Sequence, residues 1–490
     1  MDDGSKRTDF RELLPALEAI PRIKVHLIRQ NGGISAAANH GLEMATGKFV
    51  CFVDSGGLLA HDALEKCVKA LAGGFDAVYS DEDKISETGV RREPFYKPDW
   101  SPEYFRGVMY VGHLLCVRRD LAIKIGGFDS QYDAVRDFEL MLRYSEQTSR
   151  IGHVSEILYH SRTAPGSVAA TKNAQVDAAK AQMSAVQAQL DRLKLPADAA
   201  PGSIDNVVRA TPRPQPSSPK ISIIIPTKDA SDMLNNCLVS LFGETTYTDY
   251  EVICIDNETQ DVRALGLMQL FPVKRLLYPD PFSFAKANNL AADSAAGQYL
   301  VFMNNDVETL TPDWVEQMLY YAEQDDVGAV GGLLLYPDRS VQHAGVVLGC
   351  RGTADHVRLP SDSAGYGGTL ACAHEVSAVT AACLMMRRDV FLEIGGFNTH
   401  FFSIYQDVDL CLRLRSMGRR NIFTPHAVFI HHESYTRGHD YDLRDRKLLL
   451  DRWERVIQAG DPYYNRNLDV QACDFSVKVT PDSSSDNRRD

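Results

Sequence analysis

Ile221-Ser222-Ile223-Ile224-Ile225 is a continuous apolar run with the length and composition of a strand that is buried on both faces of a sheet. Similar runs follow at residues 252–256 and 300–304, and each ends in polar or acidic residues. Helix-like stretches at residues 230–242 and 284–295 separate the runs. This alternation predicts βαβ units in an α/β domain with a mainly parallel sheet, whose ligands bind beyond the carboxyl ends of the strands.

The first half of the chain repeats this pattern, with strands expected at residues 24–28, 49–54 and 77–81. Further on, Ile125-Gly126-Gly127-Phe128 matches Ile394-Gly395-Gly396-Phe397, and the two stretches lead to Asp137 and Asp407. The sequence therefore predicts a tandem duplication. An alignment without gaps that places Gly47 on Gly297 also matches Ala37 with Ala287, Asn39 with Asn289, Phe49 with Tyr299, Phe52 with Phe302 and Asp54 with Asn304.

A chain of 490 residues is too long for one ordinary core, so we expect several domains. The composition of residues 172–195 favours a helix, and the Pro-rich residues 211–219 favour an extended linker. The expected organisation is a first domain at 1–170, a helix and linker at 171–219, a second domain at 220–465 and a disordered tail at 466–490.

The composition excludes several classes of function. A formal charge of −13 argues against nucleic acid as a partner and leaves any phosphorylated ligand to local donors and a metal. The ten cysteines lack paired CxxC spacing, which predicts reduced, buried thiols. No apolar run approaches the ~20 residues of a spanning helix, and no leader pattern opens the sequence. We therefore expect a cytoplasmic protein, with peripheral contact at the inner face of the membrane left open.

Three polar segments stand where chemistry is expected. Asn304-Asn305-Asp306 follows a buried strand, a position that suits a hard divalent cation held by one carboxylate and by diphosphate oxygens, although an Asx turn is the plain structural alternative. Asp407 opens a helix-like segment, where a carboxylate is either a cap or a catalytic group. His431 and His432 end a strand-like run and point to opposite faces, so that only one of them easily joins a given metal site.

The order of these segments closely resembles glycosyltransferase family 2, the inverting enzymes with the GT-A fold, and in particular its rhamnosyltransferase-like branch. The resemblance covers about residues 220–438. It implies inverting transfer of a sugar, with rhamnose suggested, from a nucleotide-diphosphate donor to a glycan or lipid-linked glycan acceptor in surface polysaccharide biosynthesis. The matching stretches are residues 221–229, 284–289, 302–306, 342–349, 377–384, 406–413 and 431–434.

The resemblance also implies roles for individual residues. Asp306 would be the principal ligand of Mn²⁺ or Mg²⁺ in a DXD-like element, and Asp407 would be the general base that deprotonates the acceptor hydroxyl. His431 is the preferred metal-side histidine because His160 stands in the equivalent place of the first copy, with His432 as the alternative. The residues implied in nucleotide-sugar binding are Pro226, Thr227, Asp256, Lys286, Asn304, Asn305 and Arg437, the last of which has an exposed loop arginine as its alternative interpretation.

The first copy resembles the same family less completely. It begins at what looks like the family's second strand end, and Gly56 stands where Asp306 stands in the second copy. Glycine has no ligand atom in its side chain, so we expect this domain to be catalytically weak or dead, and to support the second domain or bind glycan. It nevertheless retains the candidate base Asp137 and His160.

Two other classes of function compete with sugar transfer. A non-catalytic scaffold that binds nucleotide sugars or glycans is the main alternative, and intact Asp306 and Asp407 speak against it. A nucleotide-dependent oxidoreductase would need a Gly-rich fingerprint after the first strand. Ile225 leads instead into Pro226-Thr227-Lys228.

Overall fold

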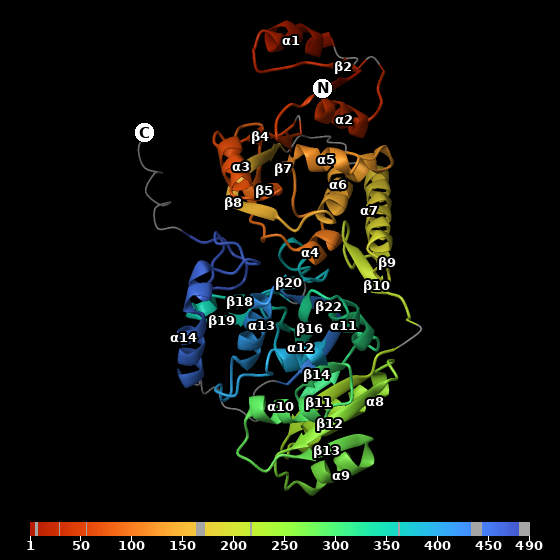
Figure 1. Ribbon diagram of the computed structural model, residues 1–490, viewed down its shortest axis with the longest axis vertical. Coiled ribbons are helices and arrows are strands. Elements are labelled where there is room, and N and C mark those ends of the chain that lie inside the picture. The colour runs from red at the N-terminus through yellow and green to blue at the C-terminus, as the bar shows by residue number, and fades with distance from the viewer. Residues whose placement is uncertain are drawn as a thin grey trace. The chain divides into compact units, whose positions relative to one another are not determined.

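The computed structural model describes residues 1–4, 8–28, 30–54, 56–162, 172–215, 218–360, 363–432 and 443–479. The chain divides into two compact units (Figure 1). Unit 1 comprises residues 1–100 and 108–210, and unit 2 comprises residues 101–107 and 211–490. Each unit contains a sheet with helices against it, so the expected α/β fold is confirmed.

The main sheet of unit 2 has the order β13-β12-β11-β14-β21-β16-β22-β15, with β17 beside β16 and β20 beside β22. The elements of unit 2 are α4 (Pro102–Gly107), β11 (Ile221–Thr227), α8 (Ser231–Glu244), β12 (Tyr250–Asp256), α9 (Val262–Leu270), β13 (Val273–Leu277), α10 (Phe284–Ser294), β14 (Tyr299–Met303), β15 (Val307–Thr309), α11 (Trp314–Ala322), β16 (Val327–Leu335), β17 (Val341–His343), β18 (Val346–Leu348), β19 (Ala354–His356), β20 (His374–Val376), β21 (Cys383–Arg387), α12 (Arg388–Glu393), α13 (Gln406–Ser416), β22 (Arg420–His431) and α14 (Leu443–Ala459), of which β18 and β19 form a separate two-stranded sheet.

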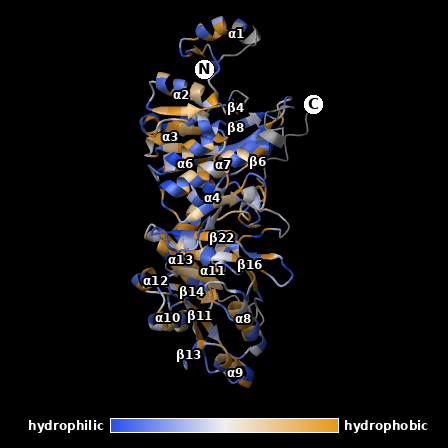
Figure 2. Cartoon of the chain, turned by 90° about the vertical axis from the view of Figure 1, so that its right-hand side faces the viewer, coloured by the Kyte–Doolittle hydropathy of each residue, from blue (hydrophilic) through white to orange (hydrophobic). Residues whose placement is uncertain are grey.

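Parallel pairing in this sheet brings the ends of three strands to one edge. β11 pairs in parallel with β12 and with β14, and Thr227 stands opposite Asp256. All seven residues of β11 are buried, and the hydrophobic colour of Figure 2 follows β11 and β14. Because these strands are covered on both faces, their continuous apolar runs could be recognised in the sequence.

Unit 1 repeats one half of this sheet. Its order, β3-β7-β5-β8-β4, corresponds strand by strand to β14-β21-β16-β22-β15, and β6 beside β5 corresponds to β17. Only residues 27 and 28 of the strand expected at 24–28 are extended, and they pair with β1 in a separate sheet. The elements of unit 1 are β1 (Asp2–Asp3), α1 (Thr8–Glu18), β2 (Leu27–Ile28), α2 (Ile34–Met44), β3 (Phe49–Phe52), β4 (Leu58–Leu59), α3 (Ala63–Ala72), β5 (Ala77–Ile85), β6 (Arg91–Phe95), β7 (Leu115–Arg118), α5 (Arg119–Lys124), α6 (Arg136–Ser145), β8 (Ile151–Arg162), α7 (Lys172–Arg192), β9 (Ala197–Pro201) and β10 (Val208–Pro212).

The two copies share side-chain contacts as well as strand order. The amide of Asn39 bonds both the N–H and the C=O of Phe128, at 2.8 Å each. Asn289 binds Phe397 in the same way, at 2.9 Å each. The glycine before each phenylalanine has a positive φ, and a Cβ there would lie within 2.6 Å of the asparagine oxygen. The Gly-Gly-Phe turn is therefore built around an asparagine side chain, which explains why both features recur.

The helix expected over residues 172–195 is α7, which packs in unit 1 against α6. Arg192 at its end pairs with Glu146 at 2.7 Å. β9 and β10 follow as a two-stranded sheet, so a strand reaches into the segment expected to be an extended linker. Among the residues that the structure describes, no helix combines the length and the apolar character needed to cross a membrane.

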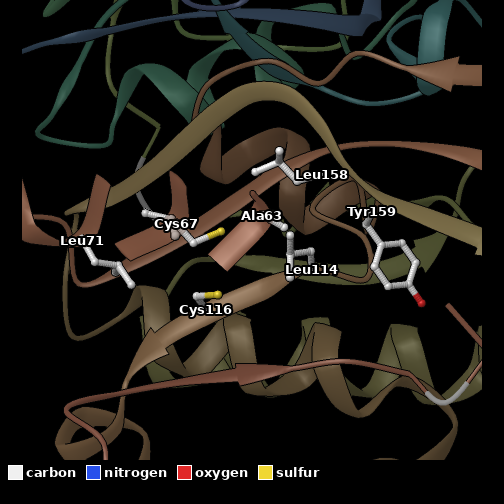
Figure 3. Close-up of a cluster of buried hydrophobic side chains, with 8 residues drawn as sticks. Ala63, Cys67, Leu71, Leu114, Cys116, Leu158 and Tyr159 are labelled. Carbon is white, nitrogen blue, oxygen red and sulfur yellow. The ribbon is translucent and has the colours of Figure 1, made fainter. Parts of the chain in front are cut away.

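A core cluster in unit 1 joins α3, β5, β7 and β8. Figure 3 shows Tyr159 at one end of this cluster, with its hydroxyl pointing away from Ala63 and Cys67. Cys51 and Cys116 are direct partners in the β3–β7 ladder and form a disulfide. The expectation that all cysteines are reduced thiols is thus wrong for this pair, because strand pairing joins residues that are distant in the sequence.

One end of a second disulfide lies in the segment expected to be a disordered tail. Cys350 is bonded to Cys473, the Phe475 ring stacks on Tyr366 at 4.9 Å between centroids, and Leu468 bridges to Val477. The prediction of disorder from residue 466 onward is therefore wrong for residues 466–479, which pack through aromatic rings and a covalent bond. Residues 480–490 lie outside the described residues.

A short segment of the first copy is part of unit 2. Residues Ser101–Gly107 belong to that unit, and Figure 1 shows α4 next to β20. The Ser101 hydroxyl and Nη1 of Arg420 both donate to the buried carboxylate of Glu375, the latter at 2.5 Å. Arg420 also lies 3.4 Å from buried Glu103. Burial raises the pKa of Glu375, and the Arg420 charge opposes that rise.

Replacing Arg420 with alanine should lower the free energy of unfolding of unit 2 by about 3–5 kcal/mol, because it leaves buried carboxylates without their cation. Urea denaturation followed by circular dichroism measures this change. Arg387→Ala is the matched control, since its partners Asp325 and Asp389 are exposed and such pairs contribute at most about 1 kcal/mol. Equal unfolding midpoints for the two variants would contradict the importance of the buried cluster.

Candidate active site

The segment Asn304-Asn305-Asp306 leaves the end of β14 and is held on two sides. The N–H of Asn304 donates to the carbonyl of Ala382, just before β21, at 3.0 Å. Nδ2 of Asn305 donates to Oγ1 of Thr227, the last residue of β11, also at 3.0 Å. The segment therefore lies across the carboxyl edge of the sheet, where parallel α/β sheets bind ligands.

Asp306 meets His431 at this edge. β15 pairs antiparallel with β22 and sets Val307 opposite His431, which brings the preceding Asp306 alongside the histidine. Oδ1 of Asp306 lies 3.2 Å from Nε2 of His431, and Nδ2 of Asn304 lies at the same distance from Nε2. Both side chains of the Asp306–His431 pair are largely buried.

Gln342 on β17 fixes the orientation of the His431 ring. Its Nε2 donates to the carbonyl of His431 at 3.3 Å, so its Oε1 is the end that faces Nδ1, at 2.6 Å. An amide oxygen only accepts hydrogen bonds, so Nδ1 carries a proton and Nε2 is the ring nitrogen turned toward Asp306. The sequence assigned no role to Gln342, because nothing in the order of residues 342–349 shows that it faces a residue 89 positions later.

His432 lies on the other side of the strand. Its Nε2 is 2.7 Å from Oε1 of Glu308, and its backbone N–H donates to the carbonyl of Asp306 at 3.1 Å. The sequence left open which histidine faces the candidate metal position. The structure places His431 beside the Asp306 carboxylate and His432 beside Glu308.

The Asp306–His431 pair fits a shared divalent cation. Adjacent ligands of an octahedral ion with bonds of about 2.1 Å stand roughly 3.0 Å apart, close to the 3.2 Å observed between Oδ1 and Nε2. Within the described residues no group of three or more His, Cys, Asp or Glu side chains is arranged to hold a metal. The described residues thus offer a partial ligand set at this edge, which fits a cation that takes further ligands from substrate phosphates and water.

Asp407 lies in the first turn of α13, next to the same strand ends. Its Oδ2 accepts a hydrogen bond from the N–H of Ala381 at 3.0 Å, and the side chain is half-buried. Tyr405, which precedes the helix, has φ of 64°, an uncommon conformation for a non-glycine residue. Residues 381 and 382 therefore connect Asp407 and Asn304 through consecutive backbone groups.

The residues expected at the nucleotide differ in exposure. Pro226 and Thr227 are buried at the end of β11, and Lys286 is exposed in the first turn of α10. The side chain of Asp256 is fully buried and accepts hydrogen bonds from the N–H of Thr259 and from Arg275. Burial alone would raise the pKa of Asp256, but these bonds outweigh it and hold the pKa below its ordinary value. Arg437 lies outside the described residues.

In unit 1 the position equivalent to Asp306 is a glycine, one residue later than the ungapped alignment placed it. Leu58 pairs with His160 as Val307 pairs with His431, so Gly57 rather than Gly56 corresponds to Asp306. A Cβ at Gly57 would lie 1.9 Å from the Tyr159 hydroxyl. Nδ1 of His160 is held by Asp83 at 2.5 Å, where His431 has Gln342.

The candidate base of unit 1 also has a different environment. Asp137 is next to Arg136, whose guanidinium donates to Asp54 at 2.9 Å. Burial raises the pKa of Asp137, and Arg136 opposes that rise. A fixed guanidinium thus stands near the strand end where unit 2 has the amide of Asn304.

Two known proteins match nearly the whole length of this chain. The chain is 35% identical over 477 residues to the uncharacterized protein y4gI of Sinorhizobium fredii, an alignment that covers 93% of this chain and 52% of that protein. It is 37% identical to the O-antigen biosynthesis protein RfbC of Myxococcus xanthus, over 98% of this chain and 38% of that protein. The chain thus spans about half or less of the length of these relatives.

A third relative matches a smaller part. The N-acetylglucosaminyl-diphospho-decaprenol L-rhamnosyltransferase of Mycobacterium tuberculosis is 26% identical over 242 residues, which cover 45% of this chain and 78% of that enzyme. The family described as Glycosyl transferase family 2 matches residues 1–126 and 222–395, which is more than half of the sequence. The chain therefore belongs to glycosyl transferase family 2.

Proposed function

We propose that unit 2 transfers a glycosyl group, with inversion, from a nucleotide-diphosphate sugar to a carbohydrate acceptor in surface polysaccharide biosynthesis. The observation that carries the proposal is the convergence of the Asp306–His431 pair and Asp407 on one sheet edge, joined through the backbone of residues 381 and 382. Membership of the family supports it.

Asp407 is the proposed general base. The hydrogen bond from the Ala381 N–H orients the carboxylate and leaves lone pairs that can accept a proton. In a single displacement, the acceptor oxygen forms its bond to the anomeric carbon while the bond to the diphosphate breaks, and the hydroxyl proton passes to Asp407. One displacement inverts the configuration at that carbon.

Asp306 and His431 are the proposed protein ligands of Mn²⁺ or Mg²⁺. When bound, the cation neutralises charge that develops on the leaving diphosphate. Gln342 keeps Nε2 of His431 directed at the ligand position, and Nδ2 of Asn304 lies 3.2 Å from the same nitrogen. This arrangement holds the imidazole and the carboxylate at a fixed separation before the donor arrives.

The nucleotide is proposed to lie over the ends of β11 and β12. Thr227 and Asn305 meet there, and Lys286 stands at the N-terminus of α10, where the helix dipole favours phosphate. Because Asp256 is fully buried, we propose that it acts by orienting Arg275, whose side chain is 42% exposed. The proposed role of Arg437 at the diphosphate rests on the family resemblance alone.

The identity of sugar and acceptor is a further part of the proposal. The rhamnosyltransferase relative favours rhamnose, and its name includes a lipid-linked acceptor. The O-antigen relative favours surface polysaccharide. Unit 1, which has Gly57 at the metal position, is proposed to support unit 2 or to bind glycan. A non-catalytic scaffold is the alternative for the whole chain.

The intact chain should release nucleoside diphosphate from one donor of a nucleotide-sugar panel only when Mn²⁺ or Mg²⁺ and an acceptor are present. Asp306→Ala and Asp407→Asn should each lower the rate by at least about 100-fold, because one removes a cation ligand and the other removes the base. A coupled assay of nucleoside diphosphate measures this. Turnover that needs no metal, or that survives Asp407→Asn, would sink the proposed mechanism.

The same assay tests whether unit 1 is active. Asp137→Asn changes the candidate base of the first copy and should leave turnover within twofold of the intact chain. Residual transfer in Asp306→Ala that disappears when Asp137→Asn is added would show instead that unit 1 is a second catalytic centre. No turnover of any donor would favour the scaffold.

Gln342→Leu should raise the Mn²⁺ concentration needed for half-maximal rate by about 10- to 100-fold, because the ring of His431 loses the acceptor that sets its tautomer. A Mn²⁺ titration at saturating donor measures this value. Gln298→Leu is the control, since Gln298 is exposed and outside the site. An unchanged titration for Gln342→Leu would contradict the proposed role of Gln342 in orienting His431 toward the cation.

A further inference from the structure

α14 contacts the segment that carries Asp407 at two separate points. Figure 1 shows α14 beside α13, and the contacts involve the loop before α13 and the first turn of α13. The mechanism proposed above uses no residue of α14. These contacts therefore need an explanation of their own.

The first contact is a carboxylate bound by backbone. Asp445 in the first turn of α14 is 1% exposed, and it accepts hydrogen bonds from three successive N–H groups. The donors are Phe402 at 2.9 Å, Ser403 at 2.7 Å and Ile404 at 3.0 Å. The next residue, Tyr405, has the positive φ and leads directly into α13. Asp445 thus fixes the chain three residues before Asp407.

The second contact holds α13 itself. Asp409 is completely buried, and its Oδ2 accepts from Nε of Arg413 at 2.8 Å within the same helix. Its Oδ1 accepts from Nε of Arg452 and from Nε1 of Trp453, both on α14 and both at 2.9 Å. Asp407 lies between the two contact points along the chain.

Comparison with the first copy shows which contacts of Asp409 occur in both units and which occur in unit 2. Glu139 corresponds to Asp409 and pairs with Arg143 as Asp409 pairs with Arg413. In the described part of unit 1, Glu139 accepts hydrogen bonds from Arg143 alone, although α7 packs against α6. The ion pair within the helix is therefore common to both copies, whereas the bonds from the following helix occur in unit 2, which has the Asp306–His431 pair.

We propose that Asp445 is a positioning residue for catalysis, which acts by holding the loop at residues 402–404 and thereby the Asp407 carboxylate at the acceptor. Arg452 and Trp453 complete the same restraint through Asp409. The inference rests on the proposed function of unit 2. A general base must be placed within hydrogen-bonding reach of its proton, and a shift of about 1 Å can reduce a rate by about 100-fold.

The test compares Asp445→Asn with Asp451→Asn in the intact chain. Both changes neutralise one aspartate of α14, but Asp451 is exposed. Asp445→Asn replaces one accepting oxygen with an amide that opposes the backbone N–H groups. We expect its kcat for transfer to fall at least tenfold, while the KM for the donor and the half-maximal Mn²⁺ concentration stay within twofold. Asp451→Asn should change none of these values.

Trp453→Phe provides a second variant that keeps an aromatic ring and loses the N–H donated to Asp409, together with the five-membered ring of the indole. It should show the same pattern, a lower kcat with an unchanged donor KM. Amide hydrogen exchange should also increase over residues 402–409 in both variants. This measurement does not depend on turnover.

The outcomes separate this inference from the function on which it rests. An active wild type whose kcat is unchanged in both Asp445→Asn and Trp453→Phe would overturn the positioning role and leave the proposed function intact. A fall in kcat matched by a rise in donor KM and by early thermal unfolding would also overturn it, since it would indicate general destabilisation. A wild type that transfers no sugar would overturn the proposed function, and this inference with it.

Discussion

The antiparallel pairing of β14 with β21 is the contact on which the site depends. Met303 stands opposite Cys383 at the end of this ladder, and the next backbone bond joins Asn304 to Ala382. One residue further, the N–H of Ala381 binds Asp407. A single ladder therefore sets the position of the Asn304–Asp306 segment relative to the carboxylate of α13, although the two are about one hundred residues apart in the sequence.

The two copies share their packing but differ in the side chains at the candidate site. Asn39 and Asn289 hold equivalent turns, and β3 pairs with β7 as β14 pairs with β21, so the packing of the two copies is alike. The side chains at the strand end differ. Gly57 stands where unit 2 has Asp306. Asp83 binds Nδ1 of His160, whereas the Gln342 amide binds Nδ1 of His431. Similar backbones thus present one strand end with a carboxylate beside a histidine and one that lacks the carboxylate.

Much of this arrangement could be predicted from the sequence. Buried strands give continuous apolar runs, which indicated β11, β12 and β14, and the polar residues after them marked the edge of the sheet. The order of short motifs along the chain also identified the stretches that contain Asp306, Asp407 and the two histidines. These features are local, because strand burial and the position of a residue at a strand end are both visible within a few residues.

The parts that could not be predicted depend on partners far apart in the chain. Gln342 meets His431 across 89 positions, and the disulfide of Cys350 joins residues 123 positions apart. Only the strand register shows that His431, and not His432, lies beside Asp306. The register also shows that Gly57, and not Gly56, is equivalent to Asp306. The burial of Asp256 under Arg275 is equally invisible in a single strand. Register and long-range packing carry this information, and composition does not.

The buried carboxylates around α13 show how such long-range packing can serve a site. A carboxylate removed from water is costly unless several donors replace its hydration, so it tolerates few alternative positions. Asp445 and Asp409 are each surrounded by three donors, and those donors come from segments on both sides of Asp407. An apolar contact of the same area would resist separation but would permit sliding. Directional bonds to buried charge restrict orientation as well, which is the property that a general base requires.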